Sequence, residues 1–196
     1  MSIKKLLLIL LCLGLVVFSA FGREKPLAKL VVYDEPSKDE KSIYVPSGWM
    51  GDYGAIKLDN SFNQNPYSGH FCQQWIYSGL MPPSQGWTGV YWQYPPDNWG
   101  SSKGMNLSGY TKFTFWARGQ IGTEIVSFQV GGIKGNYPDT LLVKIQDVQL
   151  TKEWQQYTID LFGKDLSNVS GGFAWVVSRE KNPRGCVFYL DKILYE

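Results

Sequence analysis

The stretch KFTFWAR (residues 112–118) decides the fold class, because apolar and polar side chains alternate along it. Phe113, Phe115 and Ala117 fall on one side of an extended chain, and the remaining side chains fall on the other. Residues 124–130 repeat the pattern, with three apolar positions opposed to mostly polar ones. Both segments therefore predict strands of a sheet that has one buried face and one open face.

Working outward from residues 112–118, short strand-like segments recur along the chain and no long segment has helical periodicity. The 21 glycines and 10 prolines interrupt the sequence throughout, as turns between strands would. The segments expected to be strands are residues 30–33, 55–58, 70–77, 87–94, 112–118, 124–130, 141–145, 154–161, 173–178 and 186–195. Nine or ten short strands predict an all-β fold, a two-sheet antiparallel β-sandwich in a single domain.

The N-terminal residues 1–22 are typical of a secretory signal, with a basic start, an apolar run at 6–18 and a small-x-small site at 20–22. Residues 23–29 would be a leader and 30–196 the sandwich. An uncleaved anchor is the alternative. We expect a secreted or periplasmic protein that does not insert into a membrane once the signal is removed.

The charge of the processed chain argues against polyanionic partners. The signal contains two of the 19 Lys and Arg residues and none of the 17 Asp and Glu residues, so the rest has a formal charge of 17 − 17 = 0. A neutral chain without basic runs is not expected to bind nucleic acid or an anionic membrane surface.

Two cysteines remain after processing, Cys72 and Cys186. An oxidising compartment would allow them to form a disulfide. Two separate buried thiols that pack as small hydrophobic groups are the alternative.

The segment GWTGVYWQYPPDNWG (residues 86–100) contains three tryptophans and two tyrosines in fifteen positions. Flat aromatic rings match the C–H faces of sugar rings, and nearby amide and hydroxyl groups can bind sugar hydroxyls. The segment therefore favours a sugar-binding surface, although aromatic rings are also common in cores.

Several motifs occur in an order that resembles the galactose-binding-like jelly roll of bacterial carbohydrate-binding modules. They are the acidic pair at 34–35 after the first strand, NPYSG at 65–69, LSGY at 107–110, FTFWARG at 113–119, WQQYTIDL at 154–161 and FYLDKI at 188–193. The resemblance covers residues 30–195 and implies a sheet that receives a glycan chain. An envelope protein that contacts a protein partner through the same fold is the alternative.

The resemblance also implies a structural Ca²⁺ that ties the first strand to the last. Glu35 or Asp34 and Asp191 match the acidic positions of that site, with Asp59 or Asp52 as a third contributor. Calcium takes six to eight oxygen ligands, which include carboxylates and carbonyls. The alternative is that these carboxylates are solvated or paired with basic side chains.

For the open face, we expect a polysaccharide or oligosaccharide to bind without catalysis. Trp116 would stack on a sugar ring, and Arg118 and Gln129 would bind its hydroxyls. We expect this surface to extend to Tyr91, Gln93 and Trp87, which share the side of their strand that carries the Gln93 amide. This side is expected to be open because a buried amide without partners is costly.

Catalytic motifs are sparse. His70 is the one histidine, so a Ser-His-Asp or Cys-His arrangement would depend on that residue alone. A glycoside hydrolase needs two carboxylates about 5–10 Å apart. Glu124 and Asp160 are the carboxylates on which this less favoured hypothesis would depend.

Overall fold

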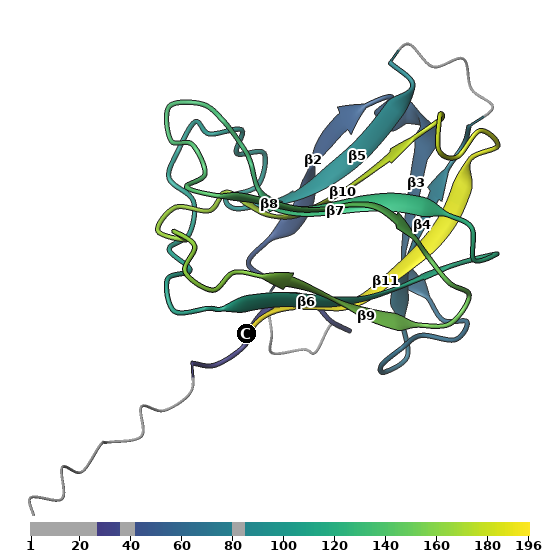
Figure 1. The fold of residues 1–196 in the computed structure, drawn as a ribbon, viewed down its shortest axis with the longest axis horizontal. Coiled ribbons are helices and arrows are strands. Elements are labelled where there is room, and N and C mark those ends of the chain that lie inside the picture. The colour runs from purple at the N-terminus through teal and green to yellow at the C-terminus, as the bar shows by residue number, and fades with distance from the viewer. Residues whose placement is uncertain (1–26, 36–41, 80–84) are drawn as a thin grey trace, which may run out of the picture.

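The structure is a computed structural model that describes residues 27–35, 42–79 and 85–196. Two antiparallel sheets stack face to face in it (Figure 1). The strands are β1 (Leu30–Tyr33), β2 (Val45–Gly51), β3 (Ile56–Phe62), β4 (Cys72–Tyr77), β5 (Trp87–Gln93), β6 (Lys112–Gly119), β7 (Ile125–Gly131), β8 (Leu142–Gln149), β9 (Gln155–Asp160), β10 (Gly171–Ser178) and β11 (Cys186–Tyr195). A 3-10 turn, η2 (Tyr53–Ala55), links β2 to β3.

Sheet A has the strand order β3-β4-β11-β6-β9, and β1 also pairs with β11. Sheet B has the order β2-β5-β10-β7-β8. Strands close in sequence often lie in different sheets, as in a jelly roll. The expected all-β sandwich is therefore confirmed.

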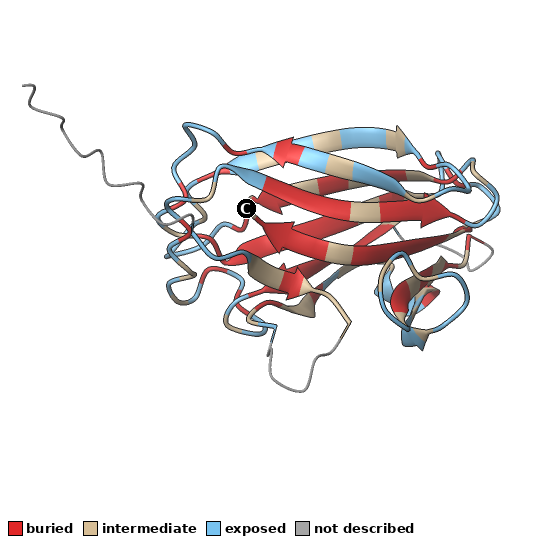
Figure 2. Cartoon of the chain, turned by 90° about the horizontal axis from the view of Figure 1, so that it is seen from below, coloured by how far each residue is buried: buried red, intermediate tan, exposed pale blue. Residues whose placement is uncertain are grey.

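The core lies between the sheets and is rich in aromatic rings. Phe113, Phe115 and Ala117 of β6 face it with no exposed surface, as their alternation predicts. On the opposing sheet, Phe173 and Trp175 of β10 are equally buried. Figure 2 shows that burial is concentrated on central strands and that strands at the edge carry many exposed residues.

Strand positions agree with expectation to within two residues except at three places. No strand was expected at Val45–Gly51, because Pro46 and Gly48 are typical of turns, yet this segment forms edge strand β2. β3 runs four residues beyond its expected end at Leu58. β8 runs four residues beyond its expected end at Ile145, through the positive φ of 51° at Asp147. The described residues therefore form eleven strands.

Candidate functional site

The residues predicted to bind one ligand lie on opposite faces of the sandwich. Trp116 and Arg118 alternate with core residues of β6, so they lie on the outer face of sheet A. Tyr91 and Trp87 of β5 and Gln129 of β7 alternate with core residues of sheet B and lie on its outer face. The expected single platform is therefore wrong, because it would need both faces at once.

On the outer face of sheet A, the chain covers its own tryptophan. Tyr67, from the segment between β3 and β4, stacks on Trp116 with ring centroids 3.6 Å apart and an interplanar angle of 15°. The backbone N–H groups of Tyr67 and Ser68 donate to Oδ2 of Asp191, at 3.0 and 3.1 Å, which fixes this segment over β6. A sugar ring could stack on this face of Trp116 only if Tyr67 moved away from it.

Arg118 is enclosed under the same segment. Its guanidinium carbon lies 3.7 Å from the ring centroid of Tyr189 and 5.2 Å from that of Trp154. Nη2 donates to the carbonyl of Gln64 at 3.2 Å, and only 8% of the residue is exposed. Arg118 is therefore largely shielded from a ligand in this conformation, contrary to its expected contact with sugar hydroxyls.

The outer face of sheet B carries a row of side chains that crosses all five strands. The strand pairing aligns Gly48 of β2 with Tyr91, Tyr91 with Ala174, Ala174 with Gln129, and Gln129 with Lys144 of β8. Tyr91 and Ala174 form a small apolar cluster with Ile133 and Met50, separate from the main core. We call these five aligned positions the sheet B row.

The phenol of Tyr91 is held by hydrogen bonds within the row. It donates to the carbonyl of Gly131 at 3.1 Å and accepts a short hydrogen bond from Nε2 of Gln129. Nε2 of Gln129 also donates to the Gly131 carbonyl at 3.2 Å. Burial raises the pKa of Tyr91 to about 12, with a smaller contribution from the charge of Asp139, so the phenol stays protonated at neutral pH.

Trp99 provides the exposed aromatic surface at one end of this row. Its ring meets that of Tyr91 edge-on, with centroids 6.0 Å apart and an interplanar angle of 88°, and 46% of the residue is exposed. The aromatic window at residues 86–100 pointed to this region, but Trp99 was not singled out.

The buried side chain of Asn98 fixes the loop that carries Trp99. Its Nδ2 donates to the carbonyls of Tyr94 and Ser102 and to Oγ of Ser170. Its Oδ1 accepts backbone N–H groups from residues 100, 101 and 102. With its hydrogen-bonding groups satisfied in this way, Asn98 holds Trp99 in position before any ligand arrives.

Gln93 differs from expectation. Its amide is fully buried, with Oε1 accepting from Ser47 Oγ at 2.9 Å and Nε2 donating to the Asn98 carbonyl at 3.1 Å. Because both ends of the amide have partners, burial costs little, and the argument that Gln93 must face solvent fails. Trp87 is half-buried on the same side of β5 and pairs with Ser178.

The expected calcium ligands have partners within the protein, with one exception. Oδ1 of the buried Asp191 has no hydrogen-bond partner, and burial raises the pKa of this carboxyl to about 6. Oδ2 of Asp34 lies 4.0 Å from Nζ of Lys192, and Oε2 of Glu35 accepts the N–H of His70 at 2.8 Å. The orphaned oxygen fits one calcium ligand.

The other acidic candidates add little to that site. Oδ1 of Asp59 accepts the N–H of Ser61, and Asp52 accepts the N–H groups of Gln85 and Gly86 in a different loop. Within residues 27–35, 42–79 and 85–196, no cluster of three or more acidic, histidine or cysteine side chains suits a metal ion. Calcium binding at this place would therefore rely on the free oxygen of Asp191 and on backbone carbonyls.

Of the two alternatives for the cysteines, the structure has the separate buried thiols. Cys72 and Cys186 are both buried free thiols. Cys186 pairs with Tyr77 at the far end of β4 from Cys72. Five residues of strand span about 17 Å, whereas bridged cysteines have Cα atoms less than about 7 Å apart.

The two carboxylates of the hydrolase hypothesis are far apart. Asp160 pairs with Lys112 at the start of β6, and Glu124 lies against Gly119 at its end. Seven residues of strand separate these ends by about 23 Å, more than twice what a glycosidase pair allows. Both oxygens of Glu124 accept backbone N–H groups, from residues 121–123.

Comparison with solved structures places this architecture among known folds. A family 30 carbohydrate-binding module of a cellulosomal cellulase of Clostridium thermocellum superimposes with a TM-score of 0.57 at 16% identity, over 87% of this chain and 98% of that one. The fold is that of carbohydrate-binding modules. This agrees with the jelly roll that the sequence motifs suggested.

Two further structures extend the likeness. A family 11 module of C. thermocellum, in complex with a β-1,3-1,4-mixed-linked tetrasaccharide, gives a TM-score of 0.56 at 12% identity over 87% of this chain and 96% of that one. An agarase, AgWH50C, gives 0.52 at 12% identity, over 87% of this chain and 25% of that one. No family model matches the sequence, and no curated protein matches it.

Two expectations concern the chain's location. The signal at residues 1–22 lies outside the described residues. Among the residues that the structure describes, no helix has the length and hydrophobicity needed to cross a membrane.

Proposed function

We propose that this protein binds a polysaccharide or oligosaccharide, without catalysis, on the outer face of sheet B. One observation carries the proposal: Trp99 stands exposed and fixed beside the sheet B row, on a fold that carbohydrate-binding modules share. An exposed indole offers the apolar face that a sugar ring needs.

The row supplies the polar contacts beside that ring. Tyr91 and Ala174 are themselves buried, so a ligand would contact the row at Gln129 and, beside the row, at Trp99. The amide of Gln129 and the ammonium of Lys144 are the hydrogen-bonding groups of the row that a ligand could reach. Trp87 lies four residues from Tyr91 along β5, about 13 Å away, where it could contact a second sugar.

Fixing the loop before binding contributes to affinity. Ordering a flexible side chain on binding costs about 0.5–1.5 kcal/mol. The hydrogen bonds of Asn98 hold the loop, and the edge-on contact with Tyr91 orients the indole of Trp99, so part of that cost is avoided. The proposed site therefore needs little rearrangement.

We also propose that the protein acts outside the cytoplasm, as a secreted or periplasmic protein. The apolar run and small-x-small site within residues 1–22 support this proposal. N-terminal sequencing of the exported protein would check whether the chain begins near residue 23.

Affinity electrophoresis and calorimetry on a panel of soluble glycans test the binding proposal. Trp99→Ala is expected to weaken binding about tenfold or more, the equivalent of about 1.4 kcal/mol, with little change in melting temperature. Phe162→Ala is the matched control, because Phe162 is 77% exposed and follows β9 in the other sheet.

If wild type ignores every glycan and instead retains a protein partner that Trp99→Ala releases, the face serves assembly and the carbohydrate proposal is wrong. Reducing-sugar release by the wild type would contradict the absence of catalysis.

A further inference from the structure

The outer face of sheet B carries positive charge that the protein itself does not neutralise. The four ion pairs among the described residues use Lys29, Lys112, Lys181 and Lys192. Lys144 of the sheet B row and Lys134 of the loop between β7 and β8 are both exposed and belong to none of them.

The carboxylates nearest to this face are already engaged. Oδ1 and Oδ2 of Asp139 accept backbone N–H groups from residues 133, 170 and 171. Asp147 of β8 pairs with Lys181 at 3.4 Å. Asp97 is exposed but lies at the opposite edge of the sheet, where its N–H donates to Ser47 of β2.

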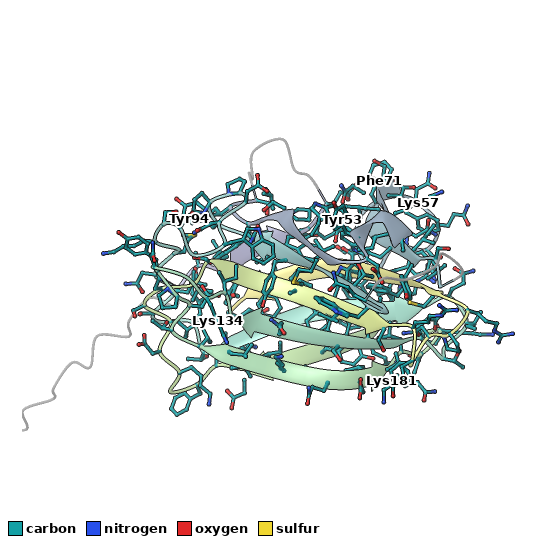
Figure 3. The ribbon with its side chains drawn as sticks, turned by 90° about the horizontal axis from the view of Figure 1, so that it is seen from above. Tyr53, Lys57, Phe71, Tyr94, Lys134 and Lys181 are labelled. Atoms are coloured by element: carbon teal, nitrogen blue, oxygen red, sulfur yellow. The ribbon has the colours of Figure 1, made fainter. Side chains whose placement is uncertain are left out.

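Lys134 and Lys144 flank the proposed ligand path. Gly100, next to Trp99, packs so closely on the Lys134 carbonyl that a Cβ there would lie 2.0 Å from that oxygen. Figure 3 shows Lys134 and Tyr94 at the same end of the molecule, with Lys181 at the other end. Lys144 lies three strands from Tyr91, about 14 Å across the sheet.

Gln129, which pairs with Lys144 across the strands, indicates which ligand groups could bind beside the lysine. Nε2 of Gln129 donates to Tyr91 and to the Gly131 carbonyl, and its Oε1 accepts no hydrogen bond from the described residues. A cation thus stands beside a free acceptor. This combination matches an anion that has a hydroxyl donor next to it.

A uronic acid has these features, because its carboxylate is formed on the exocyclic carbon and leaves ring hydroxyls free as donors. A sulfate ester is formed on a hydroxyl and so removes one of these donors. Resting on the proposed function, we propose that the ligand is a uronic-acid polysaccharide, with Lys144 and Lys134 binding its carboxylates and Gln129 accepting a ring hydroxyl.

The test compares each polyuronate with its own carboxyl-reduced form, so that charge is the main difference between them. Homogalacturonan, alginate and glucuronan form the panel, with dextran sulfate as the sulfated arm. Wild type is expected to prefer the acidic form of at least one polyuronate, and its affinity should fall as salt rises, because exposed charges are screened.

Lys144→Gln and Lys134→Gln are each expected to weaken that binding about two- to fivefold, as exposed ion pairs do, and to reduce its salt dependence. Lys57→Gln is the matched control, because Lys57 is an exposed lysine of β3 in sheet A. Melting temperatures should stay unchanged for all three variants.

Equal binding to acidic and reduced forms, loss of affinity in Lys57→Gln alone, or binding confined to dextran sulfate would each overturn this inference. Binding to neutral glycans that Trp99→Ala abolishes would overturn it while the proposed function stands. If no glycan binds at all, the proposed function fails as well.

Discussion

Replacing Trp116 with alanine tests whether glycan binds on the outer face of sheet A or on that of sheet B. Alternation along β6 alone predicts that this tryptophan stacks on a ligand, so its removal should reduce glycan retention. The structure predicts the reverse, because Tyr67 already occupies the ring face at 3.6 Å. We expect Trp116→Ala to destabilise the fold and leave glycan binding unchanged.

The expected loss of folding stability follows from the burial of the Trp116 ring and from its stacking on Tyr67. A tryptophan buries at most about 150–250 Å², and at about 25 cal/mol per Å² the partly exposed Trp116 contributes about 2 kcal/mol. The stack on Tyr67 adds about 1 kcal/mol. A total of about 3 kcal/mol corresponds to a fall in melting temperature of about 6–12 °C.

Differential scanning calorimetry and urea unfolding of Trp116→Ala, Tyr67→Ala and the double variant measure this loss. The two single changes should be coupled by about 0.5–1.5 kcal/mol, because each removes the same stack. Tyr67→Phe keeps the ring and is the control. The reasoning is refuted if Trp116→Ala melts within about 2 °C of wild type and no longer binds glycan.

The remaining predictions concern the metal, the thiols and a crowded glycine. Added Ca²⁺ should raise the melting temperature of the wild type above its value in EDTA. Asp191→Asn should abolish this difference, because it removes the carboxylate with the free oxygen. Equal melting temperatures of the wild type with and without Ca²⁺ would speak against the calcium site. Cys72 and Cys186 should resist alkylation in the native protein at pH 8, because burial raises the pKa of each thiol to about 12, and both should react in urea. Fast native labelling, followed by mass spectrometry, would contradict that burial. Gly48→Ala should lower the free energy of unfolding, measured in urea, by about 1–3 kcal/mol, because the added Cβ would lie 2.8 Å from side-chain atoms of Tyr91 and Gln93. An unchanged free energy of unfolding would show that β2 can shift to make room.

The sheets were predictable because each strand's pattern is local. In β6 and β7 the apolar positions recur every second residue, so the buried side of each strand can be read from a few residues. β2 was missed because Pro46 and Gly48 weaken that pattern at a sheet edge, where proline is tolerated.

The candidate site was less predictable because contacts distant in sequence decide which polar side chains remain accessible. Trp116 is covered by a residue 49 positions earlier in the chain, and no alternation in β6 records that contact. Gln93 is buried because Ser47 and Asn98 satisfy its amide. The aromatic window at 86–100 includes Trp99, but the network around Asn98 that fixes its loop has no local signature in the sequence.

The pairing of β1 with β11 affects how this protein can be immobilised or fused. Both strands belong to sheet A, and Lys29, just before β1, forms an ion pair with Glu196 at 3.1 Å. The two ends of the folded domain therefore emerge together from the layer opposite Trp99 (Figure 1). A tag or sensor-surface linkage at either end would leave the face with Trp99 oriented outward.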